Sequence, residues 1–301
     1  MIGAKESILL DTDIGSDIDD ALALAYLLRH PACELVGITT VTGEPHMRAA
    51  LADAICRETG REDIPIHVGA CHPLLVPMRQ SSAAQAAALK GSSSAGAYEN
   101  RPTAVDFLRA TIRARPGELT LVAIGPLTNV ALLFALDPLI PSLLKRLVLM
   151  GGQFAGWAPA YKAVAEWNIL CDPHAAAIVF ASDAKITAVG LDVTTLCSIP
   201  AAECREQLSR PGIPTLIAPM AEIWLQHAGS VVFHDPLAAA VIFEPQICGF
   251  ANGKVEVELT SDRASGMTYW TADENGLHTA ATTVDRTAFF EHYFQIVTGN
   301  P

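Results

Sequence analysis

The 301-residue sequence has few basic residues, few aromatic residues and no long apolar run. It contains 20 Lys and Arg against 32 Asp and Glu, which gives a formal net charge of −12. Such a surplus of acidic groups disfavours nucleic acids and anionic membrane surfaces as partners. No apolar run approaches the roughly 20 residues of a transmembrane helix, and residues 1–7 do not resemble a signal peptide. We therefore expect a cytoplasmic protein with a small neutral or cationic ligand.

Paired cysteines are missing as well. The seven cysteines are odd in number, scattered along the chain and never in the CxxC spacing. This pattern is typical of packed thiols in a reducing compartment, not of a disulfide framework. It agrees with a cytoplasmic location.

No boundary divides the chain into two domains. Half of the residues are hydrophobic, which is ample for one large core. The only low-complexity stretch, QSSAAQAAALKGSSSAGAYEN at 80–100, lies too early to separate two cores. Its small, polar composition predicts a mobile loop over a site. We expect a single domain over residues 1–301.

Short apolar runs typical of buried strands alternate with helical segments along most of the chain. The runs lie at 8–10, 34–41, 64–69, 119–125, 146–152 and 185–190, and the helical segments include 21–28, 47–60 and 172–182. This alternation predicts an open, doubly wound, mainly parallel α/β sheet. Residues 254–261 and 267–273 alternate with period two and predict an antiparallel pair at the edge of the sheet, before a last helix at 286–297.

Five aspartates lie between two apolar segments in ILLDTDIGSDIDDALALAYLL, residues 8–28. They are Asp11, Asp13, Asp17, Asp19 and Asp20. A strand precedes them and a helix follows, so they occupy a turn at the carboxyl edge of the sheet, where ligands bind, and Gly15 allows a tight turn. Solvated helix caps are the simpler explanation for an acidic run, but a helix N-terminus favours one or two acids. A bound hard cation such as calcium or magnesium explains why five aspartates lie in one turn.

Other strand ends carry polar segments that would converge on the same edge. They are VTGEPHM at 41–47, AIGPLTN at 123–129, LMGGQF at 149–154, AEWNILCDP at 165–173 and FHDPLAA at 233–239. Each alone has a structural explanation: Thr128 or Asn129 can cap a helix, and so can the HDP segment. A lone histidine is also more often structural than catalytic.

Taken in order, these motifs resemble those of the inosine–uridine-preferring nucleoside hydrolases. The motifs are DTDIGSDIDDALAL, AIGPLTN, LMGG, AEWNILCDP and HDPLAA, and the resemblance covers residues 8 to about 290. It implies that the protein hydrolyses the N-glycosidic bond of ribonucleosides to ribose and free base, in purine or pyrimidine salvage. It also implies a homodimer or homotetramer.

The resemblance further implies a role for particular residues. A calcium ion would be bound by Asp13, Asp20, the Ile124 carbonyl oxygen and Asp235. Contacts to the ribose would come from Asp19, Met150, Glu166 and Asn168. Asp13 would also be the general base for the attacking water, and His234 is a candidate proton donor to the leaving base.

The chemistry explains these residue types independently of the family. Breaking an N-glycosidic bond builds positive charge on the ribose carbon and needs a water activated on one face of the sugar. Carboxylates stabilise that charge, and calcium orients the water. A carboxylate within hydrogen-bond reach must then remove the proton of the water.

The sequence departs from the family's pattern in the acidic motif and around the substrate. Ser16, Asp17 and Ile18 separate the glycine from the aspartate pair, where the family usually has one residue, so the role of Asp17 is open. Glu44 stands where asparagine is common, and Lys90 where a His-Gly pair is frequent.

These departures leave the choice between purine and pyrimidine open. Trp157 stands roughly where an asparagine is expected at the 5′ end of the sugar. Trp224 and His227, three apart on the helix expected before His234, could stack on or protonate the base.

Two alternatives remain. A haloacid dehalogenase-type phosphatase would explain DTDIG after a strand, but it needs a lysine and a second acidic pair at later strand ends. Lys185 lies at the start of its apolar run and not at the end, and the later acid, Asp235, is a single residue and not a pair. A non-catalytic, calcium-containing nucleoside- or sugar-binding protein is the other, and Glu44 supports it best.

Overall fold

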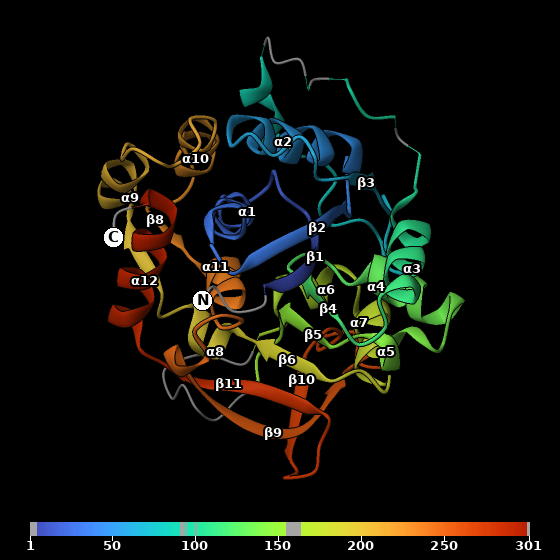
Figure 1. The fold of residues 1–301 in the computed structure, drawn as a ribbon. Coiled ribbons are helices and arrows are strands. Elements are labelled where there is room, and N and C mark those ends of the chain that lie inside the picture. Colours follow the sequence, from blue (N-terminus) through green and yellow to red (C-terminus); the bar gives the residue numbers. More distant parts are fainter. Residues whose placement is uncertain (1–4, 91–93, 95, 100, 155–163, 300–301) are drawn as a thin grey trace.

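The computed structural model describes residues 5–90, 94, 96–99, 101–154 and 164–299. Its main feature is a nine-stranded sheet of order β10-β9-β11-β6-β5-β4-β1-β2-β3 (Figure 1). The strands are β1 (Glu6–Thr12), β2 (Cys33–Thr40), β3 (Ile66–Val68), β4 (Leu119–Ala123), β5 (Arg146–Met150), β6 (Ile186–Val189), β9 (Cys248–Val257), β10 (Thr268–Ala272) and β11 (His278–Val284). Adjacent strands are parallel along β11-β6-β5-β4-β1-β2-β3. Strand β9 is antiparallel to both of its neighbours, β10 and β11. The predicted fold class is confirmed.

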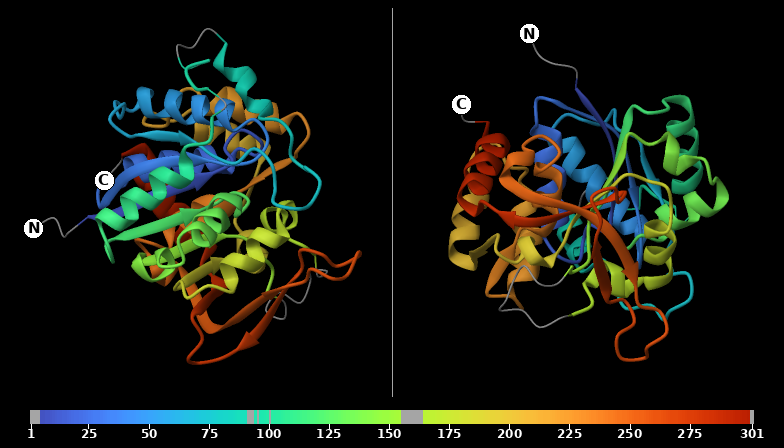
Figure 2. Two further views of the ribbon diagram at one scale, coloured as in Figure 1. Left: turned by 90° about the vertical axis from the view of Figure 1, so that its right-hand side faces the viewer. Right: turned by 90° about the horizontal axis from the view of Figure 1, so that it is seen from below.

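Helices cover both faces of the sheet (Figure 2). They are α1 (Asp19–Arg29), α2 (Pro45–Glu58), α3 (Ala104–Ala114), α4 (Thr128–Leu136), α5 (Ile140–Leu143), α6 (Trp167–Cys171), α7 (Pro173–Phe180), α8 (Leu191–Thr194), α9 (Ala201–Leu208), α10 (Ile217–Leu225), α11 (His234–Ala240) and α12 (Arg286–Thr298), with 3₁₀ helices η1 (Ala84–Leu89) and η2 (Pro245–Ile247).

The two faces follow from the alternation of side chains along each strand. Ile8 and Leu10 of β1 pack into a core with α1, α2, α11 and α12, whereas Leu9 between them packs with α3, α4 and α7 on the other face. Both faces of the parallel strands are therefore buried, which explains why the runs are continuously apolar.

The sequence missed three strand features. Strand β11 is parallel to β6 and antiparallel to β9, so it joins the predicted edge pair to the parallel strands. A second, two-stranded sheet pairs β7 (Ser198–Pro200) with β8 (Ser230–Val232). Residues 248–253 also belong to β9, ahead of the predicted start at 254.

The structure bears on the predictions for the cysteines and for the segment at 80–100. All seven cysteines are free, as predicted. The loop prediction falls partly on 91–93, 95 and 100, which lie outside the described residues; within it, 84–89 form η1, where Gln85 and Leu89 are buried. Among the described residues, every helix is too short or too polar to cross a membrane.

Candidate active site

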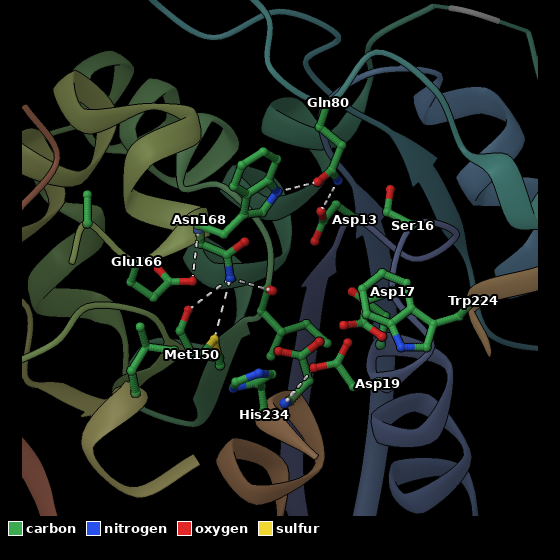
Figure 3. A pocket seen from close by; sticks show the side chains of 16 residues that line it. Asp13, Ser16, Asp17, Asp19, Gln80, Met150, Glu166, Asn168, Trp224 and His234 are labelled. Carbon is green, nitrogen blue, oxygen red and sulfur yellow. Dashed lines mark hydrogen bonds between the residues drawn. The ribbon is translucent and has the colours of Figure 1, made fainter. Parts of the chain in front are cut away.

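A cavity of about 460 Å³ lies at the carboxyl ends of β1, β4 and β5 (Figure 3). Its lining residues are Asp13, Ser16, Asp17, Asp19, Asp20, Gln80, Ile124, Met150, Ala165, Glu166, Trp167, Asn168, Leu191, Trp224, His234 and Asp235. The structure therefore brings together all the predicted site residues except His227 and Trp157. The latter lies outside the described residues.

The acidic turn is shaped by its backbone. Strand β1 continues to Thr12, and Gly15 has a φ of +116°, a conformation that side chains other than glycine rarely adopt. Thr12 Oγ1 then donates to Asp20 Oδ1 at 2.5 Å and accepts from the backbone N–H of Ile14 at 3.1 Å. The end of the strand is thereby tied to the first turn of α1, which carries Asp19 and Asp20.

Three carboxylates form the tightest acidic cluster among the described residues. Asp19, Asp20 and Asp235 are all buried, and one oxygen of each lies within 4.8 Å of the others. Asp235 comes from the first turn of α11, and its N–H donates to Asp19 Oδ2 at 3.3 Å. Burial raises the pKa of Asp235 well above its ordinary value, and the charges of Asp19 and Asp20 raise it further.

This cluster fits a hard cation. Three buried carboxylates repel one another unless a positive charge or protons neutralise them. Burial, followed by neighbouring acids, likewise raises the pKa of Asp19 and of Asp20. Oxygen ligands of this kind are the set that calcium and magnesium prefer. Asp19, assigned to the ribose by resemblance, belongs to the cluster as well.

Asp13 is 5% exposed on the wall of the same cavity. Its Oδ2 accepts a hydrogen bond from Gln80 Nε2. Burial raises the pKa of the Asp13 carboxyl, and the positive charge of Arg48 opposes that rise. The side chain is therefore held in place by a neighbour from a different segment.

Arg48 is a residue that the sequence analysis missed. It lies on α2, is fully buried, and donates to the carbonyl oxygens of Thr42 at 2.8 Å, Ile14 at 3.1 Å and Ser82 at 3.3 Å, as well as to that of Asp13. It therefore binds the backbone of the acidic turn. No spacing signal reveals this, because an arginine in a helical segment is normally solvated.

The AIGPLTN motif bonds to β1 and to the residue before α7 instead of capping a helix. Asn129 Nδ2 donates to Asp11 Oδ1 at 2.7 Å, and Thr128 Oγ1 donates to Asp172 Oδ2 at 2.8 Å. The N-cap of α4 is Leu127, without a side-chain hydrogen bond, so capping by Thr128 or Asn129 is wrong. The HDP segment likewise provides no side-chain cap to α11.

Glu166 and Asn168 shape the opposite wall. Glu166 caps α6 by accepting from the N–H groups of Asn168 at 2.9 Å and Ile169 at 3.1 Å, and burial raises its pKa to about 7. Asn168 Nδ2 donates to the carbonyl oxygens of Ile124 at 2.9 Å and Met150 at 3.1 Å. Asn168 therefore orients the carbonyl that the resemblance assigns to calcium.

His234 and Trp224 also line the cavity. His234 Nδ1 lies 2.7 Å from Thr194 Oγ1, and burial lowers the pKa of the imidazole to about 4, which favours the neutral ring. The Trp224 Nε1–H is buried and has no hydrogen-bond partner among the described residues. Figure 3 shows the two side chains on either side of Asp19.

His227, Glu44 and Lys90 are not among the residues that line the cavity. Helix α10 ends at Leu225, so His227 is in the turn that follows and not on the helix; it is exposed and does not line the cavity. Glu44 Oε2 accepts from the N–H of Ala83 at 3.0 Å, and Lys90 is exposed after η1. Neither Glu44 nor Lys90 lines the cavity.

Comparison with known proteins gives consistent matches. The family model for inosine-uridine preferring nucleoside hydrolases matches residues 8–291. The chain is 32% identical to uridine nucleosidase 1 of Arabidopsis thaliana over 275 residues, covering 86% of this chain and 80% of the relative. It is also 32% identical to the pyrimidine-specific ribonucleoside hydrolase RihA of Citrobacter koseri over 307 residues, covering 94% and 95%.

Solved structures agree with this match. The plant nucleoside hydrolase PpNRh1 superposes with a TM-score of 0.81 at 26% identity, covering 98% of this chain and 99% of the other. The purine-preferring ribonucleoside hydrolase from Gardnerella vaginalis superposes with a TM-score of 0.80 at 27% identity, covering 97% and 98%.

Proposed function

The chain belongs to the inosine–uridine-preferring nucleoside hydrolase family, and from this membership we propose that it is a calcium-dependent hydrolase of pyrimidine ribonucleosides that prefers uridine as its substrate. The observation that carries the proposal is one cavity that combines Asp19, Asp20 and Asp235 with a separate carboxylate, Asp13. The substrate follows from the names of the two sequence relatives, which are a uridine nucleosidase and a pyrimidine-specific hydrolase. Membership leaves the phosphatase alternative without support.

Calcium would be held by Asp20 and Asp235 together with Asp13 and the Ile124 carbonyl oxygen, and Asp19 lies close enough to contribute. When bound, calcium orients the attacking water, helps to lower its pKa and binds ribose hydroxyls.

The chain's own residues would supply the remaining steps. Asp13 accepts the proton of the water, because Gln80 occupies only one of its two oxygens. Glu166 and Asn168 contact the ribose hydroxyls, and Met150 lies beneath the sugar, so that the reacting carbon stays aligned with the water. His234 donates a hydrogen bond to the leaving base.

The test is release of ribose and free base from uridine, with inosine beside it, by the purified protein. We expect both products from uridine and none after chelation. Binding of uridine without release would favour the non-catalytic alternative. Faster release from inosine than from uridine would overturn the pyrimidine assignment alone.

The metal assignment gives a first prediction. Protein purified without chelator should contain about one calcium per chain, and its removal should lower Tm, since the buried carboxylates then repel one another. Asp235→Asn should lose the calcium, whereas Asp262→Asn, at an exposed position, should keep it. Elemental analysis measures the calcium content of the wild type and of both variants, and zinc in the place of calcium would contradict the assignment.

The unpartnered indole N–H of Trp224 gives a second prediction. Trp224→Phe keeps an aromatic ring but removes the indole N–H, which in our proposal gains a carbonyl oxygen of the bound base as its partner, so KM for uridine should rise about 3- to 10-fold. KM for a nitrophenyl riboside, which has no base carbonyl, should not change. An equal rise on both substrates would mean that Trp224 only shapes the cavity.

The proposal extends to the location and the assembly of the protein. Seven free cysteines favour a reducing, cytoplasmic setting, in which the released base would enter salvage. The single-domain organisation and the homodimer or homotetramer stay predictions from the sequence.

A further inference from the structure

The side chain of Gln80 bridges two parts of the cavity wall. Its Nε2 donates to Asp13 Oδ2, and its Oε1 accepts from Trp167 Nε1 at 2.5 Å. Figure 3 shows Gln80 above Asp13 with both hydrogen bonds. Asp13 follows β1, whereas Trp167 begins α6, so one amide joins the acidic turn to the wall that carries Glu166 and Asn168.

The chemistry of the partners decides which way this amide points. An indole N–H can only donate, and an ionised carboxylate can only accept. The amide oxygen must therefore face Trp167, and the amide nitrogen must face Asp13. A flipped amide would set two donors against each other and an oxygen against the carboxylate. Trp167 thus selects the orientation in which Gln80 donates to Asp13.

The backbone around Gln80 is held against the acidic turn. The Ser82 carbonyl accepts from Arg48 Nη2 at 3.3 Å, and the N–H of Ala83 donates to Glu44 Oε2 at 3.0 Å. The N–H of Gln85 donates to the Gly15 carbonyl at 2.9 Å. Glu44, which departs from the family's usual asparagine, therefore helps to fix the segment that delivers Gln80.

We propose that Gln80 is a positioning residue for Asp13 and that Trp167 keeps Gln80 in its donating orientation. This inference rests on the proposed function, in which Asp13 takes the proton of the water. With Oδ2 bonded to Gln80, the carboxylate cannot rotate freely, which leaves Oδ1 for the roles that the proposed function gives to Asp13. Trp167 is 48% exposed, so burial alone does not account for a large aromatic residue there.

The experiment is a double-mutant cycle with uridine as substrate. Gln80→Ala should lower kcat about 10- to 100-fold with KM within about twofold of wild type, because misplacing the base affects the reacting geometry and not binding. Trp167→Phe keeps an aromatic ring but removes the N–H that donates to Gln80 Oε1, so it should also lower kcat. The double variant should be no worse than Gln80→Ala alone, since both changes break one chain of contacts.

The control variant is Gln246→Ala, an exposed glutamine far along the chain, which should match wild type. Calcium content and Tm of every variant should stay at the wild-type values. A wild-type kcat in Gln80→Ala, a rise in KM alone, or loss of calcium would overturn the positioning role. If the losses in kcat of the two single variants add up in the double variant, Trp167 does not act through Gln80, and its orienting role is overturned. If the wild-type protein releases no base from any ribonucleoside, the proposed function fails, and the positioning role with it.

Discussion

Asp13→Asn is expected to lower kcat on uridine by about 10²- to 10⁴-fold, the range for loss of a positioned general base. Asparagine has nearly the same shape, and its amide oxygen can still accept from Gln80 Nε2, but it cannot take a proton from water. The variant therefore removes the proton acceptor while it keeps most of the local contacts. Steady-state kinetics and calcium content must be measured on the same sample.

The control separates proton transfer from metal binding. Asp183→Asn, at an exposed position, should keep full activity and calcium. If Asp13→Asn loses calcium and excess calcium restores its activity, Asp13 is a ligand and not the base. Wild-type turnover in Asp13→Asn with calcium present would contradict both roles.

Much of the fold and of the cavity could be predicted from the sequence, because their signals are local. The buried parallel strands are continuous apolar runs, and the acidic turn lies directly between a strand and a helix. Parallel topology then brings the carboxyl ends of β1, β4 and β5 to one edge, which places Asp13, Ile124 and Met150 together.

The contacts that position the site could not be predicted in this way. Arg48, Gln80 and Trp167 reach the acidic turn or one another across 32 to 87 residues of sequence. Arg48 and Gln80 belong to no spaced motif, and the motif that contains Trp167 gives no sign of its partner. Strand β11 was missed because its partners, β6 and β9, are also distant in the chain. Spacing cannot reveal such pairings, since they depend on how whole elements pack.

Trp224 and His227 show how a small boundary error misplaces a residue. A helix that continued past Leu225 would bring both side chains to nearby positions on one face. The observed helix ends there, and the His227 N–H donates to the Trp224 carbonyl at 3.0 Å in the turn. Helix ends are the least reliable part of a sequence-based prediction, because capping is decided by local contacts.

His234→Ala is expected to lower kcat on uridine by about 10²- to 10³-fold, the range for loss of one positioned donor to a developing negative charge. Because burial lowers the pKa of His234 to about 4, the neutral ring would act through a hydrogen bond from Nε2. That tautomer requires the Thr194 hydroxyl to donate to Nδ1, so Thr194→Val should cause a smaller loss in the same sense.

A nitrophenyl riboside distinguishes this role from a structural one, because its leaving group needs no hydrogen-bond donor to depart. His234→Ala should largely spare its turnover and should keep calcium, since the ring itself is not in the acidic cluster. Equal losses on uridine and on the nitrophenyl riboside would mean that His234 supports only Asp235, its neighbour on α11. The next candidate donor would then be Trp224, which lines the same cavity and has a buried indole N–H without a partner among the described residues, and the double variant with Trp224→Phe would test it.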